Sequence, residues 1–336
     1  RQRTERPMER IGVIGGGAWG TALATVAARA GRRAVLWAVE PEVVESINSA
    51  HDNPVYLPGV EIDEDIWATT DLADVAYADV LLLTPPAQHL REIATRLAAH
   101  LAPGVPLVVC SKGVEQGTHA LMTEVLAEIA PDAPVAVLSG PTFAREVALG
   151  LPTAVTLACA DRDLGIELAR ALGQPMFRPY LTDDLVGTQV GGAVKNVLAI
   201  ACGIIEGREL GENARASLIT RGLSEITRLG VSRGARAETF KGLAGIGDVM
   251  LTCTSLQSRN MSLGAELGRG STLGDILAAR KSVAEGVYTA SAVVEHAEQL
   301  DVEMPISEAV DGILNHGASI DDAIGGLLSR AFKTEN

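Results

Sequence analysis

A glycine-rich hexapeptide directly behind an apolar stretch is the feature of this chain that most constrains its fold. Residues 15–20 read Gly-Gly-Gly-Ala-Trp-Gly and fit the pattern GxGxxG, with a strand-like run before them and an alanine-rich run after them. In such a strand–turn–helix unit Gly15 permits the tight turn, Gly17 lets the backbone approach a pyrophosphate, and Gly20 allows the helix to pack closely on the strand. Unpaired N–H groups at the helix start then favour phosphate. The motif predicts a dinucleotide-binding βαβ unit.

Short apolar runs alternate with helical patterns through the first half of the chain. The predicted strands cover residues 11–15, 34–38, 80–84, 106–110, 135–139 and 154–158. The predicted helices between them include residues 18–30, 88–100 and 118–130. Several of the strands are almost continuous Val, Leu and Ile, which is typical of parallel strands covered on both faces. The alternation predicts an α/β domain with a Rossmann-like doubly wound sheet, whose ligands gather at the carboxyl ends of the strands.

The second half of the chain reads as helical throughout. Predicted helices cover residues 185–206, 213–229, 261–268, 289–300 and 305–315, and no convincing strand separates them. Because 336 residues exceed what one core usually holds, two domains are expected. We expect residues 1–9 to form a flexible tail, residues 10–184 an NAD(P)-binding Rossmann domain, and residues 185–336 an all-α domain that binds the substrate.

The charge balance and the cysteines argue against several classes of protein. The chain has 28 Lys and Arg against 42 Asp and Glu, a formal net charge of −14, whereas nucleic-acid-binding proteins normally carry a basic surface. The four cysteines are widely spaced and form no CxxC pair, which argues against a zinc site and a disulfide framework and favours a reducing cytoplasm. No apolar run reaches the roughly 18 residues of a membrane span, so we expect no stable membrane insertion.

A carboxylate at the end of the second predicted strand bears on the choice of cofactor. Glu40 lies 20 residues beyond Gly20, about where an acidic residue binds the ribose 2′-hydroxyl of NAD. An Arg near Val39 would instead favour the 2′-phosphate of NADP, and none is present. The alternative for Glu40 is a surface acid that caps the helix after Pro41. On these two residues the sequence leans towards NAD and leaves NADP open.

Two further strand ends carry residues suited to binding an anion. Lys112 follows the predicted strand that ends at Cys110, and the turn Gly140-Pro141-Thr142 follows the strand that ends near Leu138. A lysine at this edge of the sheet can anchor or polarise an oxyanion, and a Gly-Pro turn can present backbone N–H groups at close range. The alternative for Lys112 is a solvated side chain in a loop.

The helical half contains a lysine inside an otherwise apolar helix. Lys195 and Asn196 follow Gly-Gly-Ala-Val, and a buried lysine costs several kcal/mol unless it is paired or loses its proton. Lys195 is therefore a candidate general acid or base with a depressed pKa. The alternative is an ammonium group that reaches past the small residues to water.

Two helix starts in the same half carry polar residues. Asp248 follows the glycine-rich turn 245–247 and is either a simple N-cap or the partner that orients Lys195. Ser258-Arg259-Asn260 is a cap followed by a basic and an amide residue. An arginine at a helix start suits a phosphate, because its guanidinium forms two parallel hydrogen bonds and the helix end adds donors. The alternative for Arg259 is a solvated surface charge.

Taken in order, these segments closely resemble the bacterial NAD(P)-dependent sn-glycerol-3-phosphate dehydrogenases. The matching stretches are residues 14–23, 111–113, 139–146, 151–153, 190–196, 213–215, 220–222, 242–254, 257–260, 283–286 and 303–306. The resemblance implies the 6-phosphogluconate-dehydrogenase-like arrangement of a Rossmann domain followed by an all-α domain. It also implies a reversible reduction of dihydroxyacetone phosphate to sn-glycerol 3-phosphate by NADH or NADPH, a reaction that supplies glycerophospholipid synthesis.

The resemblance also implies roles for individual residues. Lys195 would donate a proton to the carbonyl oxygen, and Asp248 would hold and tune Lys195. The substrate-binding residues would be Lys112, Gly140, Thr142, Lys195, Asn196, Asp248, Ser258, Arg259 and Asn260. The cofactor-binding residues would be Gly15, Gly17, Ala18, Trp19, Gly20, Lys112, Ala144, Arg259, Val283 and Glu285. Relatives often carry a basic residue where Val39 stands, so NADP preference does not follow. The family leads us to expect a homodimer, although no residue pattern identifies the interface.

Two other functions are alternatives to this one. A related β-hydroxyacid dehydrogenase would share the glycine-rich loop and the lysine of the helical domain, but we would not expect it to have Ser258-Arg259-Asn260 or Gly140-Pro141-Thr142. A non-catalytic NAD(H) sensor would have no need of a proton donor, so the combination of Lys195 and Asp248 speaks against it. The dehydrogenase acting on dihydroxyacetone phosphate is the function we expect.

Overall fold

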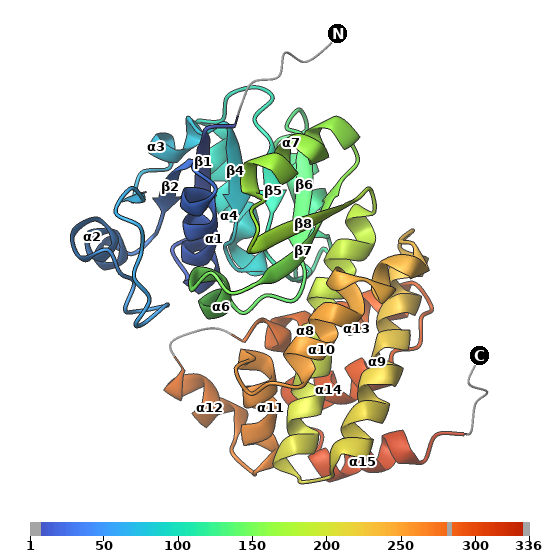
Figure 1. The fold of residues 1–336 in the computed structure, drawn as a ribbon. Coiled ribbons are helices and arrows are strands. Elements are labelled where there is room, and N and C mark those ends of the chain that lie inside the picture. The colour runs from blue at the N-terminus through green and yellow to red at the C-terminus, as the bar shows by residue number, and fades with distance from the viewer. Residues whose placement is uncertain (1–7, 281–283, 332–336) are drawn as a thin grey trace.

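The computed structural model describes residues 8–280 and 284–331, which form a sheet domain and a helical domain packed against each other (Figure 1). The sheet has eight strands in the order β3-β2-β1-β4-β5-β6-β7-β8. Their bounds are β1 Arg10–Ile14, β2 Arg33–Trp37, β3 Trp67–Thr69, β4 Val80–Leu83, β5 Leu107–Val109, β6 Val135–Ser139, β7 Thr153–Cys159 and β8 Phe177–Thr182. The first six strands run parallel, while β7 pairs antiparallel with β6 and parallel with β8.

Helices cover both faces of the sheet, which confirms the predicted doubly wound α/β domain. They are α1 Ala18–Arg29, α2 Pro41–Ala50, α3 Leu72–Ala76, α4 Ala87–Ala98, α5 Met122–Ile129, α6 Ala144–Ala148 and α7 Arg162–Leu172. Alternate side chains of β4 point to opposite faces of the sheet. Val80 and Leu82 join the core beneath α1 and α7. Leu81 and Leu83 join the core beneath α4 and α5. A parallel strand is thus buried on both sides.

Three details of the sheet domain differ from the sequence prediction. Strands β3 and β8 were missed, because they lie at the two edges of the sheet, where exposed and polar residues interrupt the apolar run. The helix predicted over 118–130 begins only at Met122, since Thr118 turns back to bond Glu115. The predicted tail at 1–9 lies mostly outside the described residues. Met8, however, packs into the core.

The second half is built from helices around one long central helix. Its elements are α8 Leu185–Gly207, α9 Glu212–Ser232, α10 Asp248–Cys253, α11 Arg259–Gly268, α12 Leu273–Ala279, α13 Glu285–Gln299, α14 Pro305–Asn315 and α15 Ile320–Leu328, with short helical segments at η1 Ala237–Lys241 and η2 Leu243–Gly247. Glycines let α8 and α11 nearly touch, because a Cβ on Gly203 would lie 2.0 Å from the Met261 carbonyl oxygen. This close packing confirms an all-α second domain.

Helix α8 is long and apolar enough to cross a membrane, but 83% of its most apolar window is buried within the protein. Its N-terminus lies directly after the sheet, because β8 ends at Thr182 and Asp184 caps the helix through the Gly187 N–H. The other carboxylate oxygen of Asp184 accepts from the Thr239 hydroxyl at 2.6 Å. The central helix is therefore anchored at the junction of the two domains.

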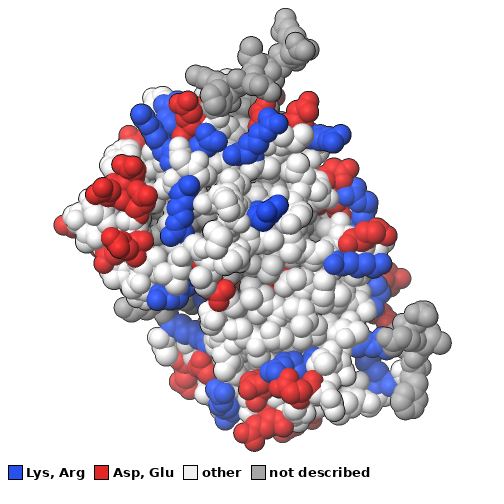
Figure 2. Space-filling model, in the orientation of Figure 1, with Lys and Arg blue, Asp and Glu red and all other residues white. Residues whose placement is uncertain are grey.

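Charged side chains of both signs lie mostly around the rim of the face shown in Figure 2, whose centre carries few of them. Acidic side chains gather at its left edge, over the position of α2 in Figure 1. Helix α2 carries Glu42 and Glu45 and no basic residue. The net charge of −14 is thus unevenly distributed.

Candidate active site

The glycine-rich loop between β1 and α1 has room for a phosphate group. Gly15 adopts φ 122°, which only glycine reaches readily, and a Cβ on Gly20 would lie 1.9 Å from the Gly15 carbonyl oxygen. A Cβ on Gly17, by contrast, would meet nothing within 4 Å. Gly17 caps α1 with no side-chain hydrogen bond, and the first turn of α1 carries no acidic residue. The buried Trp19 Nε1 in this loop also has no partner among the described residues.

The end of β2 is packed directly against this loop. A Cβ on Gly16 would lie 2.4 Å from the Cβ of Ala38, and the Gly15 N–H donates to the Trp37 carbonyl oxygen. Glu40, two residues beyond Ala38, is half-buried and accepts a hydrogen bond of 2.8 Å from the Tyr56 hydroxyl. Glu40 stands at the N-cap position of α2, but its side chain makes no capping bond, so the alternative of a capping surface acid is wrong.

Two lysines from different domains meet on one buried carboxylate. Lys112, in the loop after β5, donates from Nζ to Asp248 Oδ2 at 2.7 Å, and Lys195, from the middle of α8, donates to Asp248 Oδ1 at 2.6 Å. The exposed fractions of these side chains are 14% for Lys112, 8% for Lys195 and 0% for Asp248. The solvated alternatives for both lysines are therefore wrong, and Asp248 is more than an N-cap.

Local packing explains why the lysine of α8 reaches this carboxylate. A Cβ on Gly191 would lie 2.2 Å from the Ala244 carbonyl oxygen, so α8 and η2 are in direct backbone contact one turn before Lys195. Lys195 Nζ also donates to Thr252 Oγ1 at 2.7 Å. Thr252 lies one turn beyond Asp248 on α10 and was not predicted as a site residue, although its i+4 spacing from Asp248 places both on one helix face.

The surroundings of Lys195 favour its neutral form more than water does. Burial and, to a smaller extent, the charge of Lys112 lower the pKa of Lys195, while Asp248 raises it, and the net pKa is about 8. An ammonium group has three donors, of which Lys195 uses two in the described contacts. The third can reach a bound oxygen atom. Lys195 is thus suited to give or take a proton near neutral pH.

The turn after β6 completes the sheet side of this cluster. The Gly140 carbonyl oxygen accepts from Lys112 Nζ at 3.0 Å and from the Thr142 hydroxyl at 3.2 Å. Gly140 adopts φ 143° and lies against β7, where a Cβ would be 3.1 Å from the Val155 Cα. The hydroxyl of Ser139 is buried and has no hydrogen-bond partner among the described residues. It lies close to α8, because a Cβ on Gly192 would be 2.9 Å from its oxygen.

The predicted phosphate-binding segment lies at the start of α11. Ser258 caps this helix through the Met261 N–H, and Asn260 is buried and accepts from the Gly286 N–H at 3.0 Å. Arg259 is exposed between them. Gly286 is also in close contact with α8, because its Cβ would lie 2.8 Å from the Asn196 carbonyl oxygen. The starts of α11 and α13 therefore meet beside α8.

The remaining predicted cofactor residues lie at other helix starts. Ala18 and Ala144 begin α1 and α6 and pack against the same core. Glu285 begins α13, and burial raises its pKa while Arg259 opposes that shift. Val283 lies outside the described residues. Within residues 8–280 and 284–331 no group of three metal-binding side chains comes together.

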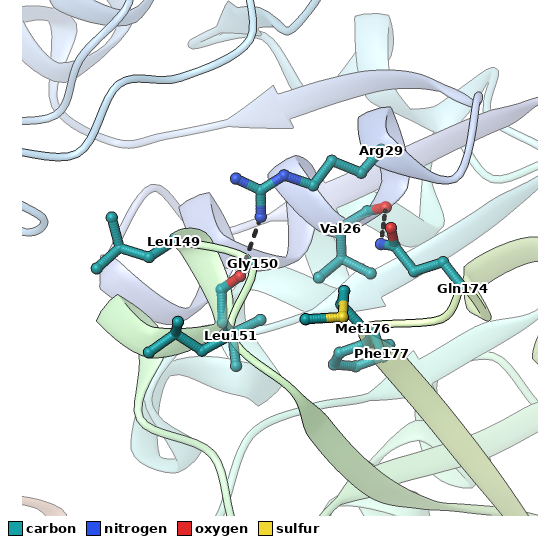
Figure 3. A pocket seen from close by; sticks show the side chains of 9 residues that line it. Val26, Arg29, Leu149, Gly150, Leu151, Gln174, Met176 and Phe177 are labelled. Atoms are coloured by element: carbon teal, nitrogen blue, oxygen red, sulfur yellow. Dashed lines mark hydrogen bonds between the residues drawn. The ribbon is translucent and has the colours of Figure 1, made fainter.

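Two cavities of about 200 Å³ are present in the described structure. One opens between the start of α4 and the start of α13 and is lined by Pro86, Gln88, Gln116, Glu285 and Tyr288 among others. The other, shown in Figure 3, lies between the end of α1 and the start of β8. In that cavity the Arg29 guanidinium already binds the Val147 and Ala148 carbonyl oxygens. Only the first cavity includes a predicted site residue.

Comparison with known proteins decides between the dehydrogenase families. The sequence model of the N-terminus of NAD-dependent glycerol-3-phosphate dehydrogenase matches residues 10–165, and the model of its C-terminus matches residues 184–325. The chain belongs to the NAD-dependent glycerol-3-phosphate dehydrogenase family. Its cofactor is therefore NAD or NADP, and the β-hydroxyacid dehydrogenase alternative is set aside.

Individual relatives agree over almost the whole chain. Glycerol-3-phosphate dehydrogenase [NAD(P)+] of Parvibaculum lavamentivorans is 58% identical over 326 residues, covering 97% of this chain and 98% of the relative. The enzyme of the same description from Caulobacter vibrioides is 58% identical over 97% of this chain and 99% of its own. The crystal structure of glycerol-3-phosphate dehydrogenase from Coxiella burnetii superposes with a TM-score of 0.92 at 39% identity, covering 96% of this chain and 99% of that one.

Proposed function

We propose that this chain catalyses the reversible reduction of dihydroxyacetone phosphate to sn-glycerol 3-phosphate, with Lys195 as the proton donor. The observation that carries the proposal is the cluster in which Lys112 and Lys195 share the buried carboxylate of Asp248 at the junction of the two domains. Two buried positive charges against one negative charge leave an excess of one positive charge. Such a site suits an oxygen atom that becomes negative during reaction.

The residues around the glycine-rich loop fit a dinucleotide. The open space outside Gly17 and the unpaired N–H groups at the start of α1 would receive the pyrophosphate, and Trp19, Ala144 and Glu285 would border the cofactor. Bound in its reduced form, the nicotinamide would supply a hydride to the carbonyl carbon of the substrate.

The lysine pair would then handle charge and proton at the carbonyl oxygen. Lys195 gives its free proton to that oxygen, and its two other N–H groups keep it aligned on Asp248 and Thr252. Lys112 holds the same oxygen or its neighbour through its remaining donor. In the reverse direction neutral Lys195 takes the hydroxyl proton. Asn196, Gly140 and Thr142 line the substrate on either side of this pair.

The first test is the loss of reduced-nicotinamide absorbance in the presence of dihydroxyacetone phosphate, with NADH and NADPH in parallel. Turnover that depends on both substrates is expected, and its product is sn-glycerol 3-phosphate by chiral analysis. If the cofactor binds but no dihydroxyacetone phosphate is consumed, the proposed function is wrong.

Arg259→Ala is expected to raise the KM for dihydroxyacetone phosphate by about 10- to 100-fold, because a hydrogen bond to a charged group contributes about 1.5–3 kcal/mol. The proposal is supported by the exposed position of Arg259 at the start of α11, where it can receive a phosphate. Arg269→Ala, exposed at the other end of the same helix, is the matched control and is expected to leave KM unchanged. Equal KM values for both variants would remove Arg259 from the phosphate site.

Gly17→Ala is expected to weaken NADH binding by about tenfold or more, because a side chain there occupies the space through which the backbone approaches the pyrophosphate. Its φ of −70° suits any residue and its Cβ meets nothing, so the melting temperature should stay near that of the unaltered protein. Gly325→Ala, also in open space, is the control. Calorimetric titration with NADH measures the change, and unaltered affinity would contradict the assigned loop.

We further infer a homodimer that works in the cytoplasm without stable membrane insertion. Helix α15 has no buried residue and Leu328 is 81% exposed, which supports an apolar surface for a second copy. The four free cysteines fit a reducing compartment. Light scattering coupled to gel filtration tests the dimer. The division into an NAD(P)-binding part at residues 10–184 and a substrate-binding part at 185–336 belongs to the same proposal.

A further inference from the structure

The segment that follows β1 and α1 is unusual in its charge. Residues 34–90 contain 11 Asp and Glu and no Lys or Arg. They include all of β2 after Arg33, then α2, β3, α3, β4 and the start of α4. This is the part of the sheet on which the adenosine half of a dinucleotide rests in this fold. Figure 2 shows the acidic side chains gathered over α2. A second phosphate on the adenosine ribose would enter this negative field.

One of these acids is held in place at the end of β2. Glu40 accepts a hydrogen bond of 2.8 Å from the Tyr56 hydroxyl, and that bond raises the pKa of Tyr56 to about 12. Tyr56 therefore stays protonated and remains the donor at neutral pH. The neighbouring Val39 is 62% exposed and offers no charge or hydrogen-bonding side chain to a phosphate.

The loop that carries Tyr56 is tied to the glycine-rich loop itself. Asn53 is fully buried, and its Nδ2 donates to the Gly16 carbonyl oxygen at 2.8 Å and to the Thr21 hydroxyl at 2.9 Å. Asn53 Oδ1 accepts from the Tyr56 N–H at 3.2 Å. A continuous chain of contacts thus runs from the phosphate-binding loop through Asn53 and Tyr56 to the carboxylate of Glu40.

We propose that Glu40, positioned by Tyr56, makes this protein selective for NAD(H) over NADP(H). A carboxylate accepts hydrogen bonds from the ribose hydroxyl of NAD(H), whereas it repels the 2′-phosphate of NADP(H). The inference rests on the proposed function, because it assumes a dinucleotide bound along the glycine-rich loop. Glu40 is the residue that touches the ribose, and Tyr56 is a positioning residue.

Two arginines lie near this region and could in principle receive a phosphate. Arg145 donates to the Pro58 carbonyl oxygen, and Arg96 lies over the Trp37 ring at 5.8 Å from its centroid. Neither hydrogen bonds with Glu40 or Tyr56 in the described part of the chain. Both arginines therefore have contacts of their own away from the carboxylate of Glu40.

Direct binding and kinetics together test the selectivity. The dissociation constants of NADH and NADPH are measured by titration of the intact protein, and kcat/KM for each is measured with dihydroxyacetone phosphate. We expect the dissociation constant and kcat/KM each to favour NADH over NADPH by about 10- to 100-fold. This is the effect of losing a hydrogen bond to a charged group, with charge repulsion in its place. Glu40→Gln should reduce this preference for NADH by about tenfold. Glu298→Gln, at an exposed acid near the end of α13 and outside the acidic segment, should leave the preference unchanged.

Tyr56→Phe separates positioning from a merely structural role. The substitution should raise the KM for NADH several-fold with little change in kcat, and it should lower the ratio of kcat/KM with NADH to kcat/KM with NADPH. In a protein that already carries Glu40→Gln, Tyr56→Phe should not change this ratio. Equal or tighter binding of NADPH by the unaltered protein would overturn the inference and leave the proposed function standing. NADH-selective binding without turnover of dihydroxyacetone phosphate would support the selectivity and overturn the function.

Discussion

Lys195→Met is expected to lower kcat for dihydroxyacetone phosphate reduction by about 10²- to 10⁴-fold, the range that a positioned general acid contributes. Methionine fills the same buried space without a proton to give, so the fold should survive. The dissociation constant of NADH should change by less than about twofold, because Lys195 lies on α8 and not on the glycine-rich loop. Lys241→Met, at an exposed lysine of the same domain, is the control.

The dependence of activity on pH provides a second test of the role of Lys195. Burial lowers the pKa of Lys195 to about 8, so reduction, which needs the protonated lysine, should decline as the pH rises through about 8. Oxidation of sn-glycerol 3-phosphate needs the neutral lysine and should rise over the same range. Both pH-dependent changes, the decline of reduction and the rise of oxidation near pH 8, should disappear in Lys195→Met. If Lys195→Met kept a near-normal kcat, or if its activity still changed near pH 8, Lys195 would not be the group that transfers the proton.

Asp248→Asn removes the negative charge that Lys112 and Lys195 share, and its effect on both stability and activity should be large. Two buried ammonium groups would then face a neutral amide. Breaking a buried ion pair by removing one partner typically costs about 3–5 kcal/mol, and a loss of this order in the free energy of unfolding is expected from urea denaturation. Asp132→Asn, at an exposed loop position, should cost almost nothing.

The activity of Asp248→Asn should depend on pH in a way that a structural defect would not. Without the carboxylate, Lys195 loses the strongest interaction that raises its pKa, and this pKa should fall below about 8. Less of the lysine is then protonated at neutral pH, and reduction should drop by about 100-fold. Lowering the pH should restore part of it. An unshifted profile with uniformly lower activity would mean that Asp248 only stabilises the fold.

The elements that the sequence predicted well are those whose pattern repeats over many residues. Strand β6 and helix α14 have their predicted bounds, and the glycine-rich loop lies at the predicted junction. Edge strands such as β8 were missed, because an exposed strand lacks a continuous apolar run. The antiparallel direction of β7 was also not predicted, since an apolar run carries no information about which way a strand points.

Some residues of the candidate site could be predicted from the sequence and others could not. Lys112, Lys195 and Asp248 could be singled out because each is a charged residue in an unusual place, at a strand end, in an apolar helix or after a glycine-rich turn. Thr252, Asn53 and Tyr56 could not, because a threonine or an asparagine has no pattern of its own until its partner is known. Their importance comes from contacts across 16 to 57 positions in sequence.

By itself, the sequence determined the place of the glycine-rich loop between a strand and a helix, the order of a sheet domain and a helical domain, and the candidate residues for anion binding and proton transfer. These follow from local spacing and from the free energy of burying apolar side chains. Only the tertiary structure decided that two lysines share one buried carboxylate and that Tyr56 holds Glu40. Protonation state and side-chain orientation depend on neighbours brought together by packing, so no local pattern contains them.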